Sequence, residues 1–295
     1  MKVAVVAHAE KMLGGGLPEL RRVLEAEEVR DPLWYEVPKA KKASEQVQRA
    51  LDEGAELVFA WGGDGTVRRC VDVLSGTDAA LAVLPAGTAN LFAANLGIPA
   101  DIEQAVAIGL RGARRRIDVG RFEKERFAVM AGAGFDAAMI RDADDLKARI
   151  GRAAYLWSGS RKLRGDAFDA QIVADDCEWY EGRATCILLG NLGDVFGGVE
   201  VFPDARPDDG MLELGIVTAE GLLQWTRTLA RTAVGDPNRS PFVRTTKASS
   251  VDVALDRKVR YELDGGDRSK VKSFKVKVEE RALNVCVPQR NEEMI

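Results

Sequence analysis

The 295-residue sequence has few residues of several kinds, and each shortage excludes a class of protein. Its single histidine, His8, excludes a metal site built from several imidazoles. Its four cysteines lie far apart without the paired spacing of a zinc site. We therefore expect a cytoplasmic protein with reduced thiols, in which Cys70, Cys186 and Cys286 belong to the core. No apolar run approaches the roughly 20 residues that cross a bilayer. A net charge of −4 argues against a nucleic-acid binder.

Glycine, in contrast, is frequent, and two glycine-rich stretches each follow a short apolar run. Gly62-Gly63-Asp64-Gly65-Thr66 follows residues 57–61, and Gly87-Thr88-Ala89-Asn90 follows residues 81–85. Such runs predict buried strands of a parallel sheet, so both loops are expected at the carboxyl ends of strands, where α/β sheets bind ligands. Glycine lets backbone N–H groups approach an anion, and a following helix adds partial positive charge. The two loops therefore predict a site for the phosphates of a nucleotide.

The order of elements predicts two domains. Residues 1–118 alternate strands and helices, which predicts a Rossmann-like α/β domain with a parallel sheet. The strands expected there also include 3–7 and 33–37, and the helices are 17–27, 41–53 and 102–110. Residues 119–295 predict a β-rich domain, interrupted by helical segments at about 136–164 and 219–233. Its expected strands are 168–173, 184–189, 211–217, 251–255, 259–263, 274–278 and 283–287.

The two glycine loops resemble those of the diacylglycerol kinase catalytic family, which includes bacterial lipid kinases, sphingosine kinases and ceramide kinases. Further motifs of the family follow in order: Ile117-Asp118-Val119-Gly120, residues 131–137, Phe202-Pro203-Asp204-Ala205, Asp209-Gly210 and Leu263-Asp264-Gly265. The resemblance implies a Rossmann-like N-terminal domain, a C-terminal β-sandwich and an active site in the cleft between them. It also implies that the C-terminal tail, about 284–295, packs back on the first domain. The implied activity is that of an ATP- and magnesium-dependent kinase acting on a hydroxyl of diacylglycerol or a related lipid.

The first loop would hold ATP through its backbone N–H groups and one hydroxyl, and the second loop would meet the nucleotide from the neighbouring strand. The residues concerned are Gly62, Gly63, Gly65 and Thr66, with Asp64 holding magnesium or orienting the loop, and then Gly87, Thr88 and Asn90. By resemblance, Asp209 would bind a supporting magnesium ion together with the backbone carbonyls of Arg206 and Met211. Simpler interpretations stay open: Asp64 or Thr88 capping the following helix, and a solvated acidic turn around Asp209.

The sequence departs from the family at the proposed general base. The family has an Asp-Gly-Glu triplet, whereas this chain has Asp264-Gly265-Gly266. The candidate replacements are Asp267 and Asp264, of which Asp264 would otherwise orient the site. A carboxylate displaced by one residue along a strand points to the opposite face, which a turn at Gly265-Gly266 would correct. Val37 also stands where the family has a threonine that touches ATP.

Two other functions therefore stay open. Gly266 and Val37 favour a nucleotide- or lipid-binding protein on a kinase fold. An NAD kinase would share the first glycine loop and the two-domain plan, although the second loop is typical of lipid kinases. Basic and aromatic residues between 146 and 164 suit an anionic membrane surface, or a helix that covers a sheet. A free edge at 274–278 would allow a homodimer, although its lysines also suit a protected edge.

Overall fold

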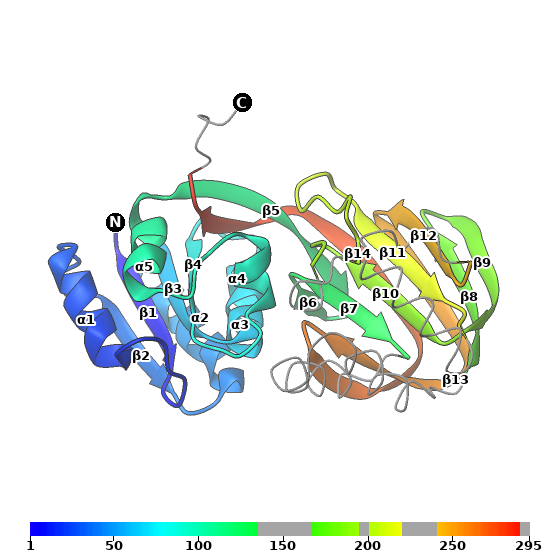
Figure 1. Cartoon of the computed structure of the whole chain (residues 1–295), viewed down its shortest axis with the longest axis horizontal. Helices are drawn as coiled ribbons and strands as arrows, with labels where there is room; N and C mark the ends of the chain where they lie inside the picture. Colours follow the sequence, from blue (N-terminus) through cyan, green and yellow to red (C-terminus); the bar gives the residue numbers. More distant parts are fainter. Residues whose placement is uncertain (135–166, 195–200, 220–240, 290–295) are drawn as a thin grey trace. The chain divides into compact units, whose positions relative to one another are not determined.

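The computed structural model describes residues 1–134, 167–194, 201–219 and 241–289 (Figure 1). It divides into two compact units, of which unit 1 comprises Met1–Val119 with Glu280–Ile295, and unit 2 comprises Gly120–Glu279. The predicted helical segments at 136–164 and, except for its first residue, 219–233 lie outside the described residues, as does the basic segment 146–164.

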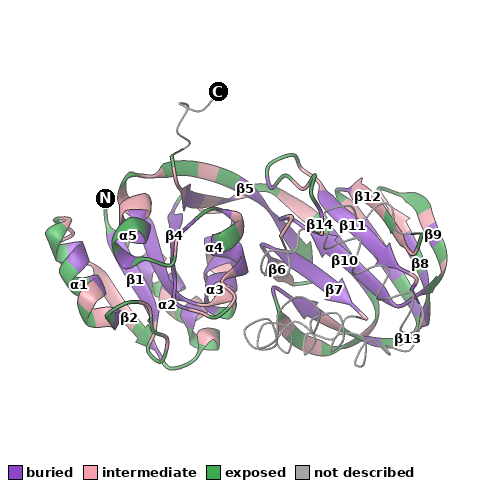
Figure 2. Ribbon diagram, viewed as in Figure 1, coloured by how far each residue is buried: buried purple, intermediate pink, exposed green. Residues whose placement is uncertain are grey.

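Unit 1 contains a parallel five-stranded sheet in the order β14-β4-β3-β1-β2. Its strands are β1 (Val3–His8), β2 (Leu33–Val37), β3 (Leu57–Gly62), β4 (Ala80–Pro85) and the end of β14 (Gly266–Val287), where Asn284 and Val285 pair with β4. β3 and β4 are buried along their whole length, as continuous apolar runs in a parallel sheet require (Figure 2). The apolar runs therefore place β3 and β4 inside the sheet, and the glycine loops follow directly from these two buried strands.

The helices of unit 1 present apolar stripes to this sheet and to one another. They are α1 (Gly16–Ala26), the 3-10 turn Ala40–Lys42, α2 (Ala43–Asp52), α3 (Asp64–Leu74), α4 (Leu91–Asn95) and α5 (Ile102–Arg111). In α1 the buried Leu20, Val23 and Leu24 have the spacing of one helix face. α1 packs on α5, which packs on β4, while α2 packs on α3 and β1. Among the described residues, no helix combines the length and apolar composition that crossing a membrane requires.

Unit 2 is built from antiparallel strands. Its strands are the end of β5 (Ala113–Phe122), β6 (Glu125–Phe127), β7 (Met130–Ala133), β8 (Phe168–Ala174), β9 (Cys177–Ala184), β10 (Cys186–Gly190), β11 (Leu212–Val217), β12 (Val243–Ala248), β13 (Ser250–Leu263) and the start of β14. They pair in the order β12-β11-β10-β7-β13-β14, with β8 between β13 and β9. The core of unit 2 includes Phe122, which stacks on Tyr261 and Phe274 at ring-centroid distances of 4.5 and 4.6 Å. The predicted fold class, an α/β domain followed by a β-rich domain, is confirmed.

The observed strands differ from the predicted ones in two ways. Two predicted strands form one continuous strand, and some observed strands were not predicted. The predicted strands 251–255 and 259–263 form one strand, β13, with a register shift between Ala254 and Val259. β9 and β12 have polar or half-exposed residues at most positions, so they lack the apolar runs that identify buried strands.

The predicted free edge at 274–278 is wrong, because β13 and β5 both pair with β14 and the Lys275 carbonyl accepts from Glu123 N. This segment therefore offers no open strand for a homodimer.

The cysteines lie as predicted, with Cys70, Cys186 and Cys286 buried, and all four thiols are free, including the exposed Cys177. Burial raises the pKa of the Cys70 thiol to about 12 and that of Cys286 to about 11, and it raises the pKa of Cys186 as well.

Because the thiolate is the reactive form, we expect a chromogenic disulfide reagent at pH 8 to label only Cys177 of the four cysteines in the native protein. All four should react after denaturation, and Cys177→Ser should abolish the native reaction. A second fast thiol in the native protein would contradict this assignment.

Candidate nucleotide-binding site

The two glycine loops lie at the same edge of the unit 1 sheet. β3 pairs in parallel with β4, with Gly62 opposite Pro85, so both strands deliver their loops at their carboxyl ends. The first loop turns directly into α3, since Thr66 N and Val67 N both donate to the Gly63 carbonyl at 2.9 and 3.1 Å. The structure thus brings together two loops that are separated by 21 positions in the sequence, from Thr66 to Gly87.

The backbones of the two loops touch at Gly63 and Gly87. A Cβ atom added to Gly87 would lie 2.4 Å from the Gly63 Cα, and one added to Gly63 would lie 3.1 Å from the Gly87 Cα. The first distance is too short for any side chain. Glycine at position 87 is therefore required by the contact between the loops, whatever it does for a ligand.

Asp64 connects the first loop to the start of α4. Its Oδ1 accepts a hydrogen bond from Phe92 N at 3.2 Å, whereas α3 has Gly63 as its N-cap residue and no side-chain cap. The simpler interpretation, in which Asp64 caps the helix that follows it, is therefore wrong. Burial raises the pKa of the Asp64 carboxyl, and the backbone N–H groups at the start of α4 offset part of this rise. These contacts favour the role of orienting the loops.

Asn90 orders the second loop from within. Its Oδ1 accepts from Gly87 N at 2.8 Å, and its Nδ2 donates to the carbonyls of Gly87 and Pro85 at 3.0 and 3.3 Å. Asn90 also occupies the N-cap position of α4 with a left-handed backbone (φ 49°), which asparagine tolerates. The predicted cap by Thr88 is therefore wrong. The Asn90 amide holds its own loop through these three bonds, which is a structural role that the sequence does not indicate.

The exposed parts of the two loops are Gly65 and Thr88. Thr66, whose hydroxyl is a predicted phosphate ligand, is instead buried: the residue is 2% exposed, and a Cβ on Gly62 would lie 2.5 Å from its Oγ1. At Gly65, an added Cβ would meet only the Ala40 Cβ, at 3.9 Å. The backbone of Gly65 is thus open to solvent in the first turn of α3, where the helix dipole favours an anion.

The partly buried carboxyl of Asp64 gives a test of its role. Because its pKa is raised in the folded state, the ionised group lowers stability at neutral pH, and this cost disappears as the pH falls below the carboxyl's unfolded pKa. We expect Asp64→Asn, which keeps an acceptor for Phe92 N, to be at least as stable as the wild type at pH 7. Asp64→Ala removes the acceptor and should cost about 1 kcal/mol. Urea unfolding at pH 4 and 7 measures both, and equal losses for the two variants would contradict this role.

In unit 2, the Asp264-Gly265 dipeptide forms the turn between β13 and β14. Leu263 pairs with Gly266, and the two residues between them have positive φ values of 47° and 73°. This is the pattern of a two-residue type I′ hairpin, which Asp-Gly favours. A turn at Gly265-Gly266, which would have corrected the direction of Asp267, is therefore not formed, since Gly266 is already the first residue of β14.

The Asp264 carboxylate is an acceptor for three backbone N–H groups. Oδ2 accepts from Ala128 N at 3.0 Å, and Oδ1 accepts from Val129 N and Met130 N, both at 2.9 Å. The residue is buried, and its own N–H donates to the Met130 carbonyl. Both carboxylate oxygens are thus occupied, which favours the orienting role of Asp264 over that of a general base.

Asp267 is exposed and lies opposite Glu262 in the β13–β14 ladder. It follows Gly266 directly along β14, so its side chain points to the face opposite to that of position 266. The space beside Gly266 is occupied by Arg268, whose Nη1 donates to the Gly266 carbonyl at 3.0 Å and whose Nε lies 3.1 Å from the Glu125 carboxylate. The structure therefore places neither candidate replacement where a glutamate at 266 would project.

A lysine ammonium from β12 lies against the predicted magnesium loop. Asp209 Oδ1 accepts from Met211 N at 3.1 Å, and Oδ2 accepts from Lys247 Nζ at 3.3 Å. Arg206, Asp209 and Lys247 line an open pocket of about 330 Å³. Partial burial lowers the pKa of Lys247, but its bonds to Glu213 and Asp209 outweigh burial and raise the pKa overall. Within the described ranges, no three metal-ligating side chains form a group that could hold an ion. This arrangement does not fit a resident magnesium ion.

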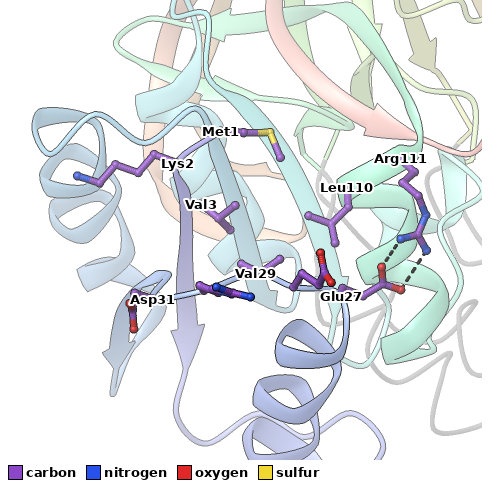
Figure 3. A pocket seen from close by; sticks show the side chains of 10 residues that line it. Met1, Lys2, Val3, Glu27, Val29, Asp31, Leu110 and Arg111 are labelled. Atoms are coloured by element: carbon purple, nitrogen blue, oxygen red, sulfur yellow. Dashed lines mark hydrogen bonds and ion pairs between the residues drawn. The ribbon is translucent and has the colours of Figure 1, made fainter.

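A pocket of about 770 Å³ in unit 1 lies at the amino-terminal end of β1 (Figure 3). It is lined by Met1, Lys2 and residues 27–31, and Arg111 closes one side through two hydrogen bonds to Glu27. The glycine loops leave the carboxyl ends of the parallel strands, so this pocket is at the other edge of the same sheet. It is therefore separate from the candidate nucleotide site.

Two family models match this chain. Residues 11–122 match the diacylglycerol kinase catalytic domain, and residues 129–287 match the YegS C-terminal NAD kinase beta sandwich-like domain. A Cronobacter sakazakii protein named "Probable lipid kinase YegS-like" is 33% identical over 83% of this chain and 83% of its own length. A diacylglycerol kinase of Staphylococcus saprophyticus is 28% identical over 78% of this chain and 77% of its own length.

Solved structures share the fold. A crystal structure of a diacylglycerol kinase from Bacillus anthracis has a TM-score of 0.76 at 20% identity and covers 97% of this chain and 96% of its own. An NAD kinase from Archaeoglobus fulgidus in complex with ATP has a TM-score of 0.58 at 14% identity and covers 99% of this chain and 95% of its own. These likenesses confirm the Rossmann-like domain followed by a β-sandwich. The two matched domains, together with the relative that is 33% identical over 83% of this chain, show that the chain belongs to the diacylglycerol kinase catalytic family, among the YegS-like lipid kinases.

Proposed function

We propose that this protein is a lipid kinase that transfers a phosphate from ATP to a hydroxyl of diacylglycerol or a related lipid. The observation that carries the proposal is the contact between Gly63 and Gly87, which joins two glycine loops at the carboxyl ends of β3 and β4. The substrate would bring the protein to a membrane surface, where such a lipid lies. Magnesium would enter as the ion that accompanies ATP.

Phosphoryl transfer depends mainly on alignment of the reactants and neutralisation of phosphate charge. In this chain, the exposed backbone at Gly65 and the N-terminus of α3 would bind the phosphates. Asp64 and Asn90 would keep the two loops in position through their bonds to the start of α4 and to Gly87. The loops are thus already ordered before a nucleotide binds, which lowers the entropic cost of binding.

A second function is favoured by the turn at Asp264. Position 266 has no side chain, the Asp264 oxygens are occupied, and Asp267 faces the other side of β14. A protein that binds ATP without transferring phosphate would have these features. An NAD kinase activity is the third candidate, since the matched C-terminal domain is described as NAD kinase-like.

The test is transfer of label from γ-labelled ATP, with magnesium, to a panel of lipid hydroxyls in mixed micelles and to NAD in parallel. Label in a lipid supports the proposal, and label in NADP identifies an NAD kinase. ATP binding by calorimetry without any transfer indicates the binding protein. Gly266→Glu should then be measured with Arg268→Ala in the same chain, because Arg268 Nη1 would lie 3.0 Å from the new Cβ. Transfer by this double variant alone would show that the missing carboxylate limits the reaction.

A further inference from the structure

The Lys247 ammonium lies among three oxygens of unit 2. Lys247 belongs to β12 and is paired with Glu213 of β11. Its Nζ lies 3.0 Å from Glu213 Oε1, 3.0 Å from the Asp204 carbonyl and 3.3 Å from Asp209 Oδ2. An ammonium group has three N–H donors. Two of these donors make hydrogen bonds, to the Asp204 carbonyl and to Asp209 Oδ2, and Glu213 Oε1 forms an ion pair with the ammonium.

Glu213 makes this cation necessary. Only 10% of the Glu213 side chain is exposed, compared with 36% of Lys247. Phe202 packs beside it, since a Cβ on Gly190, which is paired with Glu213, would lie 2.5 Å from the Phe202 ring. A buried carboxylate is costly unless a cation accompanies it. Lys247 supplies that charge and ties the loop of Asp204 and Asp209 to the sheet.

We propose that the Lys247 ammonium takes the place of a divalent cation in the Asp209 loop, so that the loop folds without metal. A magnesium ion at Asp209 would have to compete with an ammonium 3.3 Å from the same carboxylate oxygen. Magnesium also requires oxygen ligands at about 2.0–2.1 Å in octahedral geometry, whereas Asp209 Oδ1 is engaged with Met211 N. This exchange of cations affects the stability and metal binding of unit 2 and does not depend on kinase activity.

The test compares the wild type with Lys247→Met in the absence of nucleotide, so that no magnesium is carried by ATP. The melting temperature of the wild type should be the same in magnesium and in EDTA, and Mn²⁺ followed by electron paramagnetic resonance should show no ion bound at Asp209. In EDTA, Lys247→Met should melt about 5 °C lower, because Glu213 is left buried without its cation. Magnesium should restore most of this loss, and the variant should bind one Mn²⁺.

Three controls make the result specific. Lys277→Met, at an exposed lysine of β14, should change neither melting nor metal binding. Lys247→Arg keeps the positive charge and should stay indifferent to metal. Adding Asp209→Asn to Lys247→Met should abolish Mn²⁺ binding. A wild type that binds Mn²⁺ through Asp209, or that magnesium stabilises, overturns the proposal. A Lys247→Met variant that neither binds Mn²⁺ nor gains melting temperature in magnesium overturns it too. If that variant does not fold in EDTA, the metal binding and the melting temperature of the wild type still decide the question.

Discussion

Asp264→Ala is expected to lower the free energy of unfolding by about 4 kcal/mol, because three buried N–H groups lose their charged acceptor together. Alanine also disfavours the positive φ of 47° at this position. The loss should appear in urea unfolding as a shift of the midpoint. Hydrogen exchange should show faster exchange of the amides of Ala128, Val129 and Met130.

Asp264→Asn is the matched control. Asparagine tolerates the left-handed backbone, and its Oδ1 can still accept from Val129 N and Met130 N, but its amide group would face the Ala128 N–H. We expect a loss of about 2 kcal/mol, roughly half that of alanine. If Asp264 were instead the general base, Asp264→Asn would abolish phosphate transfer while leaving stability unchanged. That pattern would contradict the anchoring role.

The parts of the fold that sequence predicts are those with a strong local pattern. The apolar runs 57–61 and 81–85 identify β3 and β4, and the glycines after them identify the loops at their ends. The Asp264-Gly265 turn also has a local signal, since Asp-Gly between strands favours a type I′ hairpin. The structure has its turn at these two residues, as this local preference favours.

The contacts that define the candidate sites have no local pattern. Gly63 meets Gly87 because of the register between β3 and β4, and Asp264 reaches Ala128, which lies 136 residues earlier. Lys247 contacts Asp209 and Glu213 because β12 pairs with β11. β12 itself has no counterpart among the predicted strands, since its sequence is mostly polar. Such pairings are decided by tertiary structure, so they follow from the sequence only once the strands have been ordered.

Gly65→Ala is expected to reduce kcat/KM for ATP by about 100-fold, because a methyl group would stand on the exposed backbone that we propose to bind the phosphates. The fold should tolerate this change, since the new Cβ would meet only the Ala40 Cβ at 3.9 Å. Alanine is also the better helix former, so the free energy of unfolding should rise by about 0.5–1 kcal/mol. Transfer from labelled ATP, calorimetric ATP binding and urea unfolding measure the three quantities.

Two other variants separate a lost phosphate site from a damaged fold. Val73→Ala, in the last turns of α3, should leave both ATP binding and transfer unchanged. Gly87→Ala would place a Cβ 2.4 Å from the Gly63 Cα, so it should lose binding together with stability. Only Gly65→Ala should lose binding while stability is kept or raised. A Gly65→Ala protein that binds and uses ATP normally would show that the first turn of α3 does not bind the phosphates, and this part of the proposed site would be wrong.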